Sequence, residues 1–158
     1  SGVVDRIDWV FSEKILRIVD YKTGKYDEKA LKAENALDLF SDSEKGKIVQ
    51  LLAYKYLLMR ELAKTTPSQD PEKRLRLPAT FVPNVVAGFY FFRNLNKGFV
   101  SYELSDEPKA TDAFMAYVEN FFSTIVRDIL DTSKPFSEEP PTFYHSDFSK
   151  SSAAELMQ

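Results

Sequence analysis

The sequence predicts an α/β domain with a mixed, largely antiparallel central sheet that is flanked by helices. Three patterns favour this fold class. Residues 3–11 and the apolar run Ile15–Val19, which ends in Asp20-Tyr21-Lys22, are predicted to form two strands of a β-hairpin that turns at Ser12–Glu13. Apolar residues recur at helical spacing over residues 48–62 and 110–130. Between these two helices the chain carries a second pair of predicted strands.

The first hairpin brings two carboxylates together. A turn at Ser12–Glu13 places Asp5 directly opposite Asp20. Directly opposed side chains have Cβ atoms about 4.5–5.5 Å apart, and two carboxylates at that range repel by about 3 kcal/mol at an effective dielectric constant of 20. Removing one of them is therefore expected to relieve repulsion in the absence of metal. A divalent cation between them reverses the sign of the interaction, so this register predicts a metal site.

A lysine is expected beside that site, because strand side chains alternate between faces and Lys22 shares a face with Asp20. The same register pairs Asp8 with Arg17 on the other face, as an ordinary cross-strand ion pair. We therefore assign Asp8 a structural role, and predict a functional role for Asp5, Asp20 and Lys22.

A polar connection over residues 25–42, with a short helical stretch at 28–40, leads to the first long helix. Ser41 followed by Glu44 resembles a capping box at its start. Within the helix, Gln50 and Tyr54 lie four residues apart and share one face. On their own, they would be interpreted as a solvated residue and an edge of the core.

The second half of the chain begins with residues 65–83, which contain four prolines and the basic cluster Lys73-Arg74-Leu75-Arg76. We interpret this segment as a surface insertion, with a phosphate-contacting loop as the alternative. Residues 85–93 and 98–104 are predicted strands joined by a turn at Asn94–Gly98. A second long helix follows from Ala110 to Leu130, and its apolar stripe is predicted to be core: Phe114, Tyr117, Phe121, Ile125 and Ile129.

Composition limits the class of protein. With 158 residues, 44% of them hydrophobic, the chain is long enough for one domain with a substantial core. It has no apolar run of the ~20 residues that a membrane span needs. It has no cysteine, which excludes disulfides and thiolate metal sites and suits a cytoplasmic protein. Its net charge of −3 argues against strong autonomous binding to a polyanion.

Three strings in order carry a family resemblance: Gly2-Val3-Val4-Asp5, then Asp20-Tyr21-Lys22, then Gln50 with Tyr54 in a helix. They resemble G-x-x-D, D-Y-K and Q-x-x-x-Y of the PD-(D/E)XK nuclease superfamily, most closely the nuclease domains of RecB- and AddB-type proteins. The resemblance implies a restriction-endonuclease-like fold, in which residues 1–134 form the nuclease core and 135–158 a C-terminal tail, expected to be partly disordered.

The resemblance also implies roles for the residues of the motifs. Asp5, Asp20 and the main-chain carbonyl of Tyr21 would bind Mg²⁺ or Mn²⁺. Lys22 would orient and activate the attacking water and stabilise charge at the phosphate. Gln50 and Tyr54 would contact the DNA backbone and support the metal site. Mg²⁺ prefers one or two carboxylates and keeps several waters, which suits such a set.

Two departures from the family pattern affect these expectations. Many AddB-like domains end in a cysteine cluster that helps hold an iron–sulfur centre. The corresponding string here is Phe143-Tyr144-His145-Ser146-Asp147-Phe148, so no iron–sulfur cluster is expected. His145 is then expected to be a surface residue. The first motif begins at residue 2, so the chain is expected to be a fragment truncated at its N-terminus, with weak activity in isolation.

The predicted function is metal-dependent hydrolysis of DNA phosphodiester bonds, as an exonuclease domain of a recombination or repair helicase–nuclease. The acidic net charge suggests that a helicase or partner subunit delivers the DNA. The alternative is a non-catalytic DNA-binding or scaffolding module that retains the nuclease fold. A third interpretation is a sugar- or nucleotide-binding domain, in which the acidic pair is a coincidence.

Overall fold

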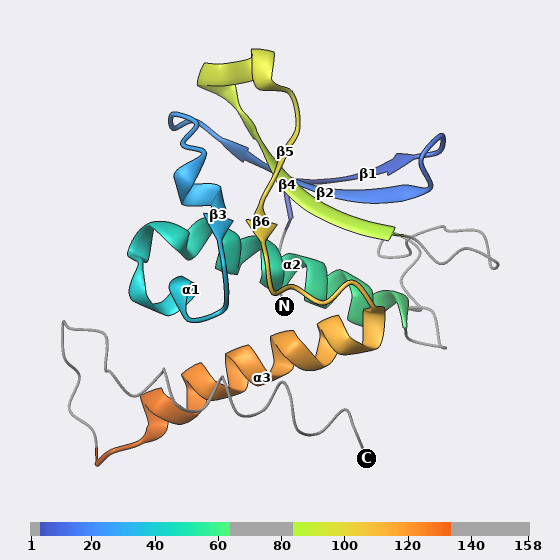
Figure 1. The fold of residues 1–158 in the computed structure, drawn as a ribbon. Coiled ribbons are helices and arrows are strands. Elements are labelled where there is room, and N and C mark those ends of the chain that lie inside the picture. Colours follow the sequence, from blue (N-terminus) through green and yellow to red (C-terminus); the bar gives the residue numbers. More distant parts are fainter. Residues whose placement is uncertain (1–3, 64–83, 134–158) are drawn as a thin grey trace. The chain divides into compact units, whose positions relative to one another are not determined.

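The computed structural model describes residues 4–63 and 84–133 (Figure 1). The described residues belong to two compact units. The first unit draws on Ser1–Asp27 and Gln50–Tyr102, and the second on Glu28–Val49 and Glu103–Gln158. The predicted nuclease motifs lie in the first unit, so its sheet and helix determine the geometry of the candidate site.

The first unit contains a four-stranded sheet in the order β1-β2-β4-β5. Its strands are β1 (Arg6–Val10), β2 (Ile15–Lys22), β4 (Asn84–Phe91) and β5 (Val100–Ser101). β1 runs antiparallel to β2, and β5 antiparallel to β4, whereas the two central strands β2 and β4 are parallel. This mixed, largely antiparallel sheet with helices confirms the predicted fold class.

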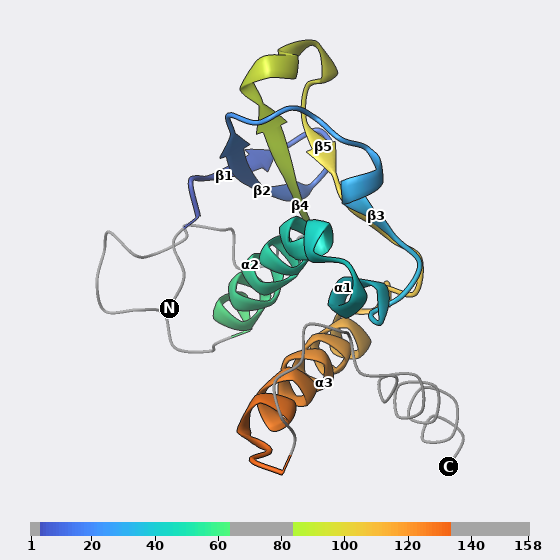
Figure 2. The same ribbon diagram turned by 90° about the vertical axis from the view of Figure 1, so that its left-hand side faces the viewer.

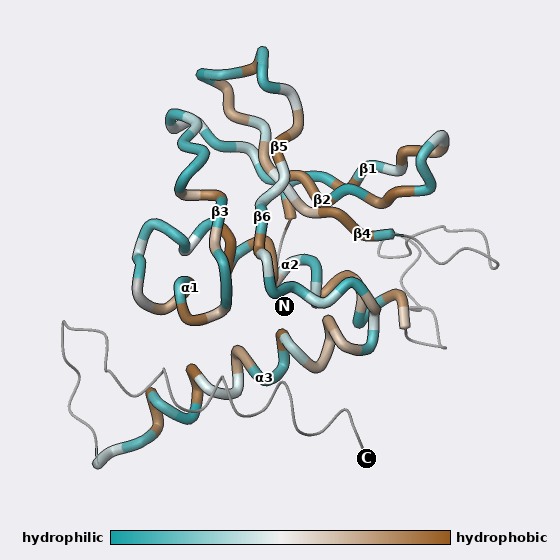
Figure 3. The backbone as a smooth tube through the Cα atoms, in the orientation of Figure 1, coloured by the Kyte–Doolittle hydropathy of each residue, from teal (hydrophilic) through white to brown (hydrophobic). Residues whose placement is uncertain are grey.

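The β1–β2 hairpin has the register expected from the sequence. Asp8 is paired with Arg17, and Arg6 with Val19, so an extension of the same ladder leads from Asp5 to Asp20. The turn spans the four residues between the strands, and Lys14 closes it with a φ of 54°. The tube is largely hydrophobic along β2 and β4 themselves, whereas the turn between β1 and β2 is mostly hydrophilic (Figure 3).

Helix α2 (Gly46–Leu62) runs along one face of this sheet in both views (Figures 1 and 2). Fully buried side chains from the two central strands and from the helix form the core of the unit, among them Leu16, Ile18, Phe89, Leu51 and Leu52. These strand residues share the face that also carries Asp20. Packing against α2 therefore places Asp20 between the sheet and the helix.

The start of α2 differs from the predicted capping box. A short 3₁₀ helix, η2 (Ser43–Lys45), precedes α2, and its N-cap is Asp42, whose side chain accepts a hydrogen bond from the Glu44 N–H at 2.9 Å. Ser41 is instead the last residue of helix α1 (Asp38–Ser41). Asp is as good an N-cap as Ser, so the choice between adjacent residues depended on where the preceding helix ended.

The predicted strand over 98–104 is wrong as a single strand. After β4 the chain forms a 3₁₀ segment, η4 (Phe92–Lys97), and Gly98 follows with a φ of 67°, in a region that favours glycine. β5 then pairs with β4, whereas β6 (Glu103–Leu104) leaves this sheet. Buried Tyr102 lies between the two short strands.

β6 pairs in parallel with β3 (Lys32–Ala33), and these two strands form the small sheet of the second unit. The N–H of Ser105 extends this pairing by donating to the carbonyl of Ala33 at 3.1 Å. The predicted helical stretch over 28–40 is therefore wrong as one element. It consists of η1 (Lys29–Leu31), β3 and the beginning of α1.

Helix α3 (Thr111–Leu130) confirms the second long helix. Phe114 and Phe121 of the predicted stripe are buried, together with Val118, but Ile129 is 56% exposed. The predicted stripe is therefore core in the first part of α3 and exposed in its last turn. Tyr117 is half-buried and donates from its hydroxyl to Asp106 at 2.9 Å.

Some sequence predictions fall outside the described residues: the 65–83 insertion with its basic cluster, and the 135–158 tail with the Phe143–Phe148 string and His145. Among the described residues, no helix is both long and apolar enough to cross a membrane.

Candidate active site

Asp20 occupies an unusual position at the end of β2. Its side chain lies on the core face of the sheet and the residue is only 5% exposed. Across residues 4–63 and 84–133, it is the one buried charged residue. An ionised carboxylate loses several kcal/mol of solvation on burial unless it is paired and hydrogen-bonded. The desolvation of Asp20 lowers the stability of the fold, so a buried acid at this position indicates a candidate functional site.

Asp20, Lys22 and Gln50 form a closed ring of polar contacts. The ammonium nitrogen of Lys22 lies 2.8 Å from Oδ2 of Asp20 and donates to Oε1 of Gln50 at 2.9 Å. The Gln50 side chain completes the ring when its Nε2 donates to Oδ1 of Asp20 at 3.1 Å. The Oδ2 contact is an ion pair without hydrogen-bond geometry. The amide of Gln50 thus holds the carboxylate and the ammonium in fixed positions.

Two aromatic residues complete the surroundings of the ring. The hydroxyl of Tyr54 accepts a hydrogen bond from Nε2 of Gln50 at 2.9 Å, one helical turn along α2. Beneath Lys22, the ring of Phe89 lies 5.3 Å from the ammonium nitrogen. Phe89 is the β4 residue paired with Asp20. The sequence analysis did not assign it to the site, because a parallel β2–β4 pairing is not visible in a local pattern.

Asp5 lies just before β1, is exposed, and has a different partner. Its Oδ2 accepts a hydrogen bond from the main-chain N–H of Tyr21 at 2.9 Å. The two acids are therefore not a bare like-charged pair, since Asp20 is neutralised by Lys22 and Asp5 binds a peptide N–H. The structure brings Asp20, Lys22, Gln50 and Tyr54 into one network and connects Asp5 to it through the main chain of Tyr21.

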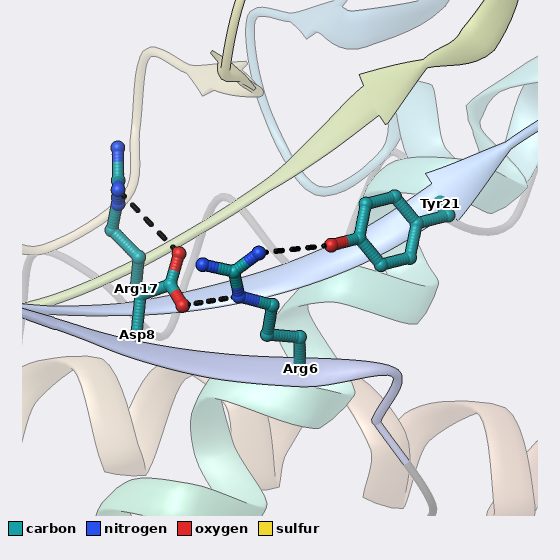
Figure 4. Close-up of polar contacts among 4 residues, drawn as sticks. All are labelled: Arg6, Asp8, Arg17 and Tyr21. Atoms are coloured by element: carbon teal, nitrogen blue, oxygen red, sulfur yellow. Dashed lines mark hydrogen bonds and ion pairs between the residues drawn. The ribbon is translucent and has the colours of Figure 1, made fainter.

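The opposite face of the hairpin carries the structural acid (Figure 4). Asp8 forms ion pairs with Arg17, at 3.5 Å, and with Arg6. The predicted pairing of Asp8 with Arg17 is thus confirmed, and Arg6 is an additional partner. Arg6 also donates to the hydroxyl of Tyr21 at 3.3 Å. The hydrogen bond to Tyr21, followed by that to Asp8, raises the pKa of the Arg6 guanidinium.

The donor set at the end of β2 fits a hard divalent cation. Asp5, Asp20 and the carbonyl of Tyr21 are oxygen donors, which Mg²⁺ prefers over nitrogen or sulfur. The described part of the chain holds no group of three or more Asp, Glu, His or Cys side chains that could bind a metal. A site with two carboxylates suits Mg²⁺, which retains water and takes substrate oxygens as its remaining ligands.

One of three comparisons with known proteins found a match. The family model of the PD-(D/E)XK nuclease superfamily matches residues 1–141, which is most of the chain. Searches among curated proteins and among solved structures gave no match. Proteins of this superfamily generally use divalent metals, as the donor set would allow. The match covers the hairpin, helix α2 and strand β4, and the chain therefore belongs to the PD-(D/E)XK nuclease superfamily.

Proposed function

We propose that this chain hydrolyses phosphodiester bonds of DNA with Mg²⁺ or Mn²⁺. We further propose that it is the cytoplasmic exonuclease domain of a RecB- or AddB-type helicase–nuclease that works in recombination or repair. The ring of contacts that Lys22 and Gln50 form around the buried Asp20 carries the proposal. A buried ion pair is weak evidence for stability, because desolvation offsets much of the attraction between its charges. Its position at the motif of a nuclease superfamily supports a catalytic purpose.

The proposed roles follow from what each group can do. Asp5, Asp20 and the Tyr21 carbonyl would hold the metal, which supplies Lewis-acid polarisation of the phosphate and activation of a water molecule. Lys22 provides the positive charge that stabilises charge developing on the phosphate. It is pre-positioned for this by the hydrogen bond to Gln50.

Gln50 and Tyr54 would serve substrate binding in addition to this support. Gln50 already uses both ends of its amide within the ring, while the Tyr54 hydroxyl accepts from Gln50 and still has its own proton to donate. A phosphate oxygen is an acceptor and would suit that donor. The hydroxyl of Tyr54 is therefore the more direct candidate for contact with DNA.

One observation favours the alternative of a non-catalytic DNA-binding or scaffolding module. The ammonium of Lys22 already neutralises Asp20 at 2.8 Å, so the carboxylate is paired without any metal. A chain that had lost catalysis would keep this pair as a structural feature. The two functions therefore differ in whether DNA is cut.

A DNA hydrolysis assay with Mg²⁺ tests the proposal. Lys22→Ala should lower kcat by about 10²–10³, the usual effect of removing one electrostatic contact from a transition state, with little change in DNA affinity. Lys32→Ala is a matched control, because Lys32 is also ion-paired, to Glu28 and Glu103 in the second unit. Equal hydrolysis by the wild type and Lys22→Ala would contradict the proposed site, and no hydrolysis by the wild type would support the scaffolding alternative.

A further inference from the structure

Two segments beside the candidate site meet at one edge of the sheet. Because β2 and β4 are parallel, their C-terminal ends lie at the same edge, and residues 21–26 and 91–97 extend from it. The N–H of Tyr26 donates to Oδ1 of Asn94 at 3.0 Å. The ring of Tyr26 also contacts that of Phe91 at a centroid distance of 5.5 Å. These contacts join the two segments into one surface.

Aromatic rings are stacked on this edge, on the face opposite Asp20. Tyr21 and Phe92 are nearly parallel, with an interplanar angle of 10° and a centroid distance of 5.5 Å. Tyr90 lies on the other strand at 6.2 Å from Tyr21. Phe92 is 53% exposed. A large apolar ring that stays half in water, stacked flat on a partner, presents a π-face to a planar ligand.

The same edge concentrates positive charge. Lys22 is paired with Asp20, but residues 23–26 and 91–97 carry three further cations, Lys25, Arg93 and Lys97, against a single neighbouring acid, Asp27. Lys25 and Arg93 are exposed and form no ion pair with another described residue. Uncompensated cations of this kind attract a polyanion within about one Debye length, even when the protein is acidic overall.

Stacked aromatic rings together with cations are the chemistry that recognises single-stranded nucleic acid. Unpaired bases stack on aromatic side chains, and the cations contact the phosphates, whereas a duplex keeps its bases stacked inside. We propose that this edge binds single-stranded DNA. A base stacks on Phe92, and the backbone contacts the cations. The edge surface is defined as Tyr21, Lys25, Tyr90, Phe92, Arg93 and Lys97.

This inference deepens the proposed function, since it names the form of DNA that reaches the site. Tyr21 lies between Asp20 and Lys22 on β2, and neighbouring strand residues point to opposite faces of the sheet. Tyr21 therefore belongs to the edge surface on one face, and Asp20 and Lys22 belong to the candidate active site on the other. A single strand of DNA that stacks on the edge surface is thus within one residue of β2 from the candidate active site. Binding to the edge needs neither metal nor cleavage, so it can be measured separately from hydrolysis.

The test measures binding of the whole chain to a labelled oligo-dT of about 15 nucleotides by fluorescence anisotropy, in EDTA and at about 50 mM salt. Phe92→Ala should weaken binding at least about fivefold, as expected when one base–aromatic stack is lost. Phe92→Tyr should retain it. Phe11→Ala is the matched control, because Phe11 is 80% exposed but lies in the turn at the other end of β2, and it should bind like the wild type.

Electrostatic contacts are tested with Arg93→Ala/Lys97→Ala. Each lost phosphate contact should reduce the slope of log K against log salt by about 0.7 for a single strand, so this variant should lose about 1.4. A 2-aminopurine base in the oligonucleotide should be quenched on binding to the wild type and not to Phe92→Leu, which keeps an apolar side chain but removes the ring.

Absence of binding by the wild type would overturn the inference, and so would any of three comparisons. The first is equal affinity of Phe92→Ala and Phe11→Ala. The second is equal affinity for a blunt duplex of the same length, which would show that unpaired bases are not recognised. The third is tighter binding of the matched RNA strand, which would assign the surface to RNA. Loss of hydrolysis in Lys22→Ala with unchanged binding at the edge would leave the inference intact.

Discussion

Asp20 illustrates how the structure changes an expectation at the level of a single residue. From the sequence, Asp5 and Asp20 face each other as like charges, so removing one should stabilise the metal-free protein. In the structure, Asp20 instead faces the ammonium of Lys22 at 2.8 Å and an amide N–H of Gln50 at 3.1 Å. The carboxylate of Asp5 has a partner of its own, the main-chain N–H of Tyr21.

We therefore expect Asp20→Asn to destabilise the protein in EDTA, by about 1.5–3 kcal/mol, the usual range for hydrogen bonds to charged groups. The measurement is urea unfolding followed by circular dichroism. Asp5→Asn serves as the control, because an exposed Asn can still accept from the Tyr21 N–H and should be nearly neutral. If Asp20→Asn were as stable as the wild type or more so, repulsion between the two acids would dominate after all.

Local patterns predicted this site in part. The hairpin register followed from the position of the turn, because a turn centred at Ser12–Glu13 places Asp8 opposite Arg17, as the structure does. The contacts of Gln50 could not be predicted in the same way. They depend on how α2 packs against β2, over a separation of 30 residues, and nothing in the local sequence fixes that geometry.

At the level of elements, long and periodic segments were predictable and short ones were not. Helix α3 was anticipated nearly to the residue, since apolar spacing over five turns leaves little ambiguity. The two-residue strand β3 was missed, and β6 was predicted only as the end of a longer strand, because each is defined by its partner 71 positions away in the register. Short strands carry no periodicity of their own, so only the packed structure specifies them.

Tyr117 on α3 gives a pH-dependent prediction. Burial, followed by the nearby charge of Asp106, raises the pKa of the Tyr117 hydroxyl above its ordinary value of 10.0. Above that value the unfolded chain loses a proton that the folded protein keeps, so unfolding becomes more favourable as pH rises, by up to about 1.4 kcal/mol per pH unit for one group. Stability from this group is complete below pH ~10 and declines above it.

Tyr117→Phe should remove this contribution. At pH 8 the variant should be less stable by about 1 kcal/mol, because the hydrogen bond to Asp106 is lost. Between pH 9 and 11 its stability should fall less steeply than that of the wild type. Urea midpoints across this range provide the measurement, and parallel curves for the two proteins would show that Tyr117 ionises equally in the folded and unfolded chains.

At the level of the whole molecule, the location of the proposed metal site in only one of the two units leads to a prediction about metal binding. Every proposed metal ligand comes from the first unit, and none from the second. A ligand that binds only the folded form stabilises it by RT ln(1 + [L]/Kd), which is about 1.4 kcal/mol at ten times Kd. Because the units are separate clusters of contacts, we expect this stabilisation to act on the first unit.

Hydrogen exchange with and without Mn²⁺ at ten times its Kd tests this expectation. Amides of β2 and β4 should exchange about tenfold more slowly with metal, whereas those of α3 should exchange at the same rate. Asp20→Ala should abolish the difference, and Glu103→Ala, which removes an acid of the second unit that pairs with Lys32, should preserve it. Equal slowing of α3 and β2 would mean that the two units open together. Slowing that survives in both Asp5→Ala and Asp20→Ala would place the metal elsewhere in the chain.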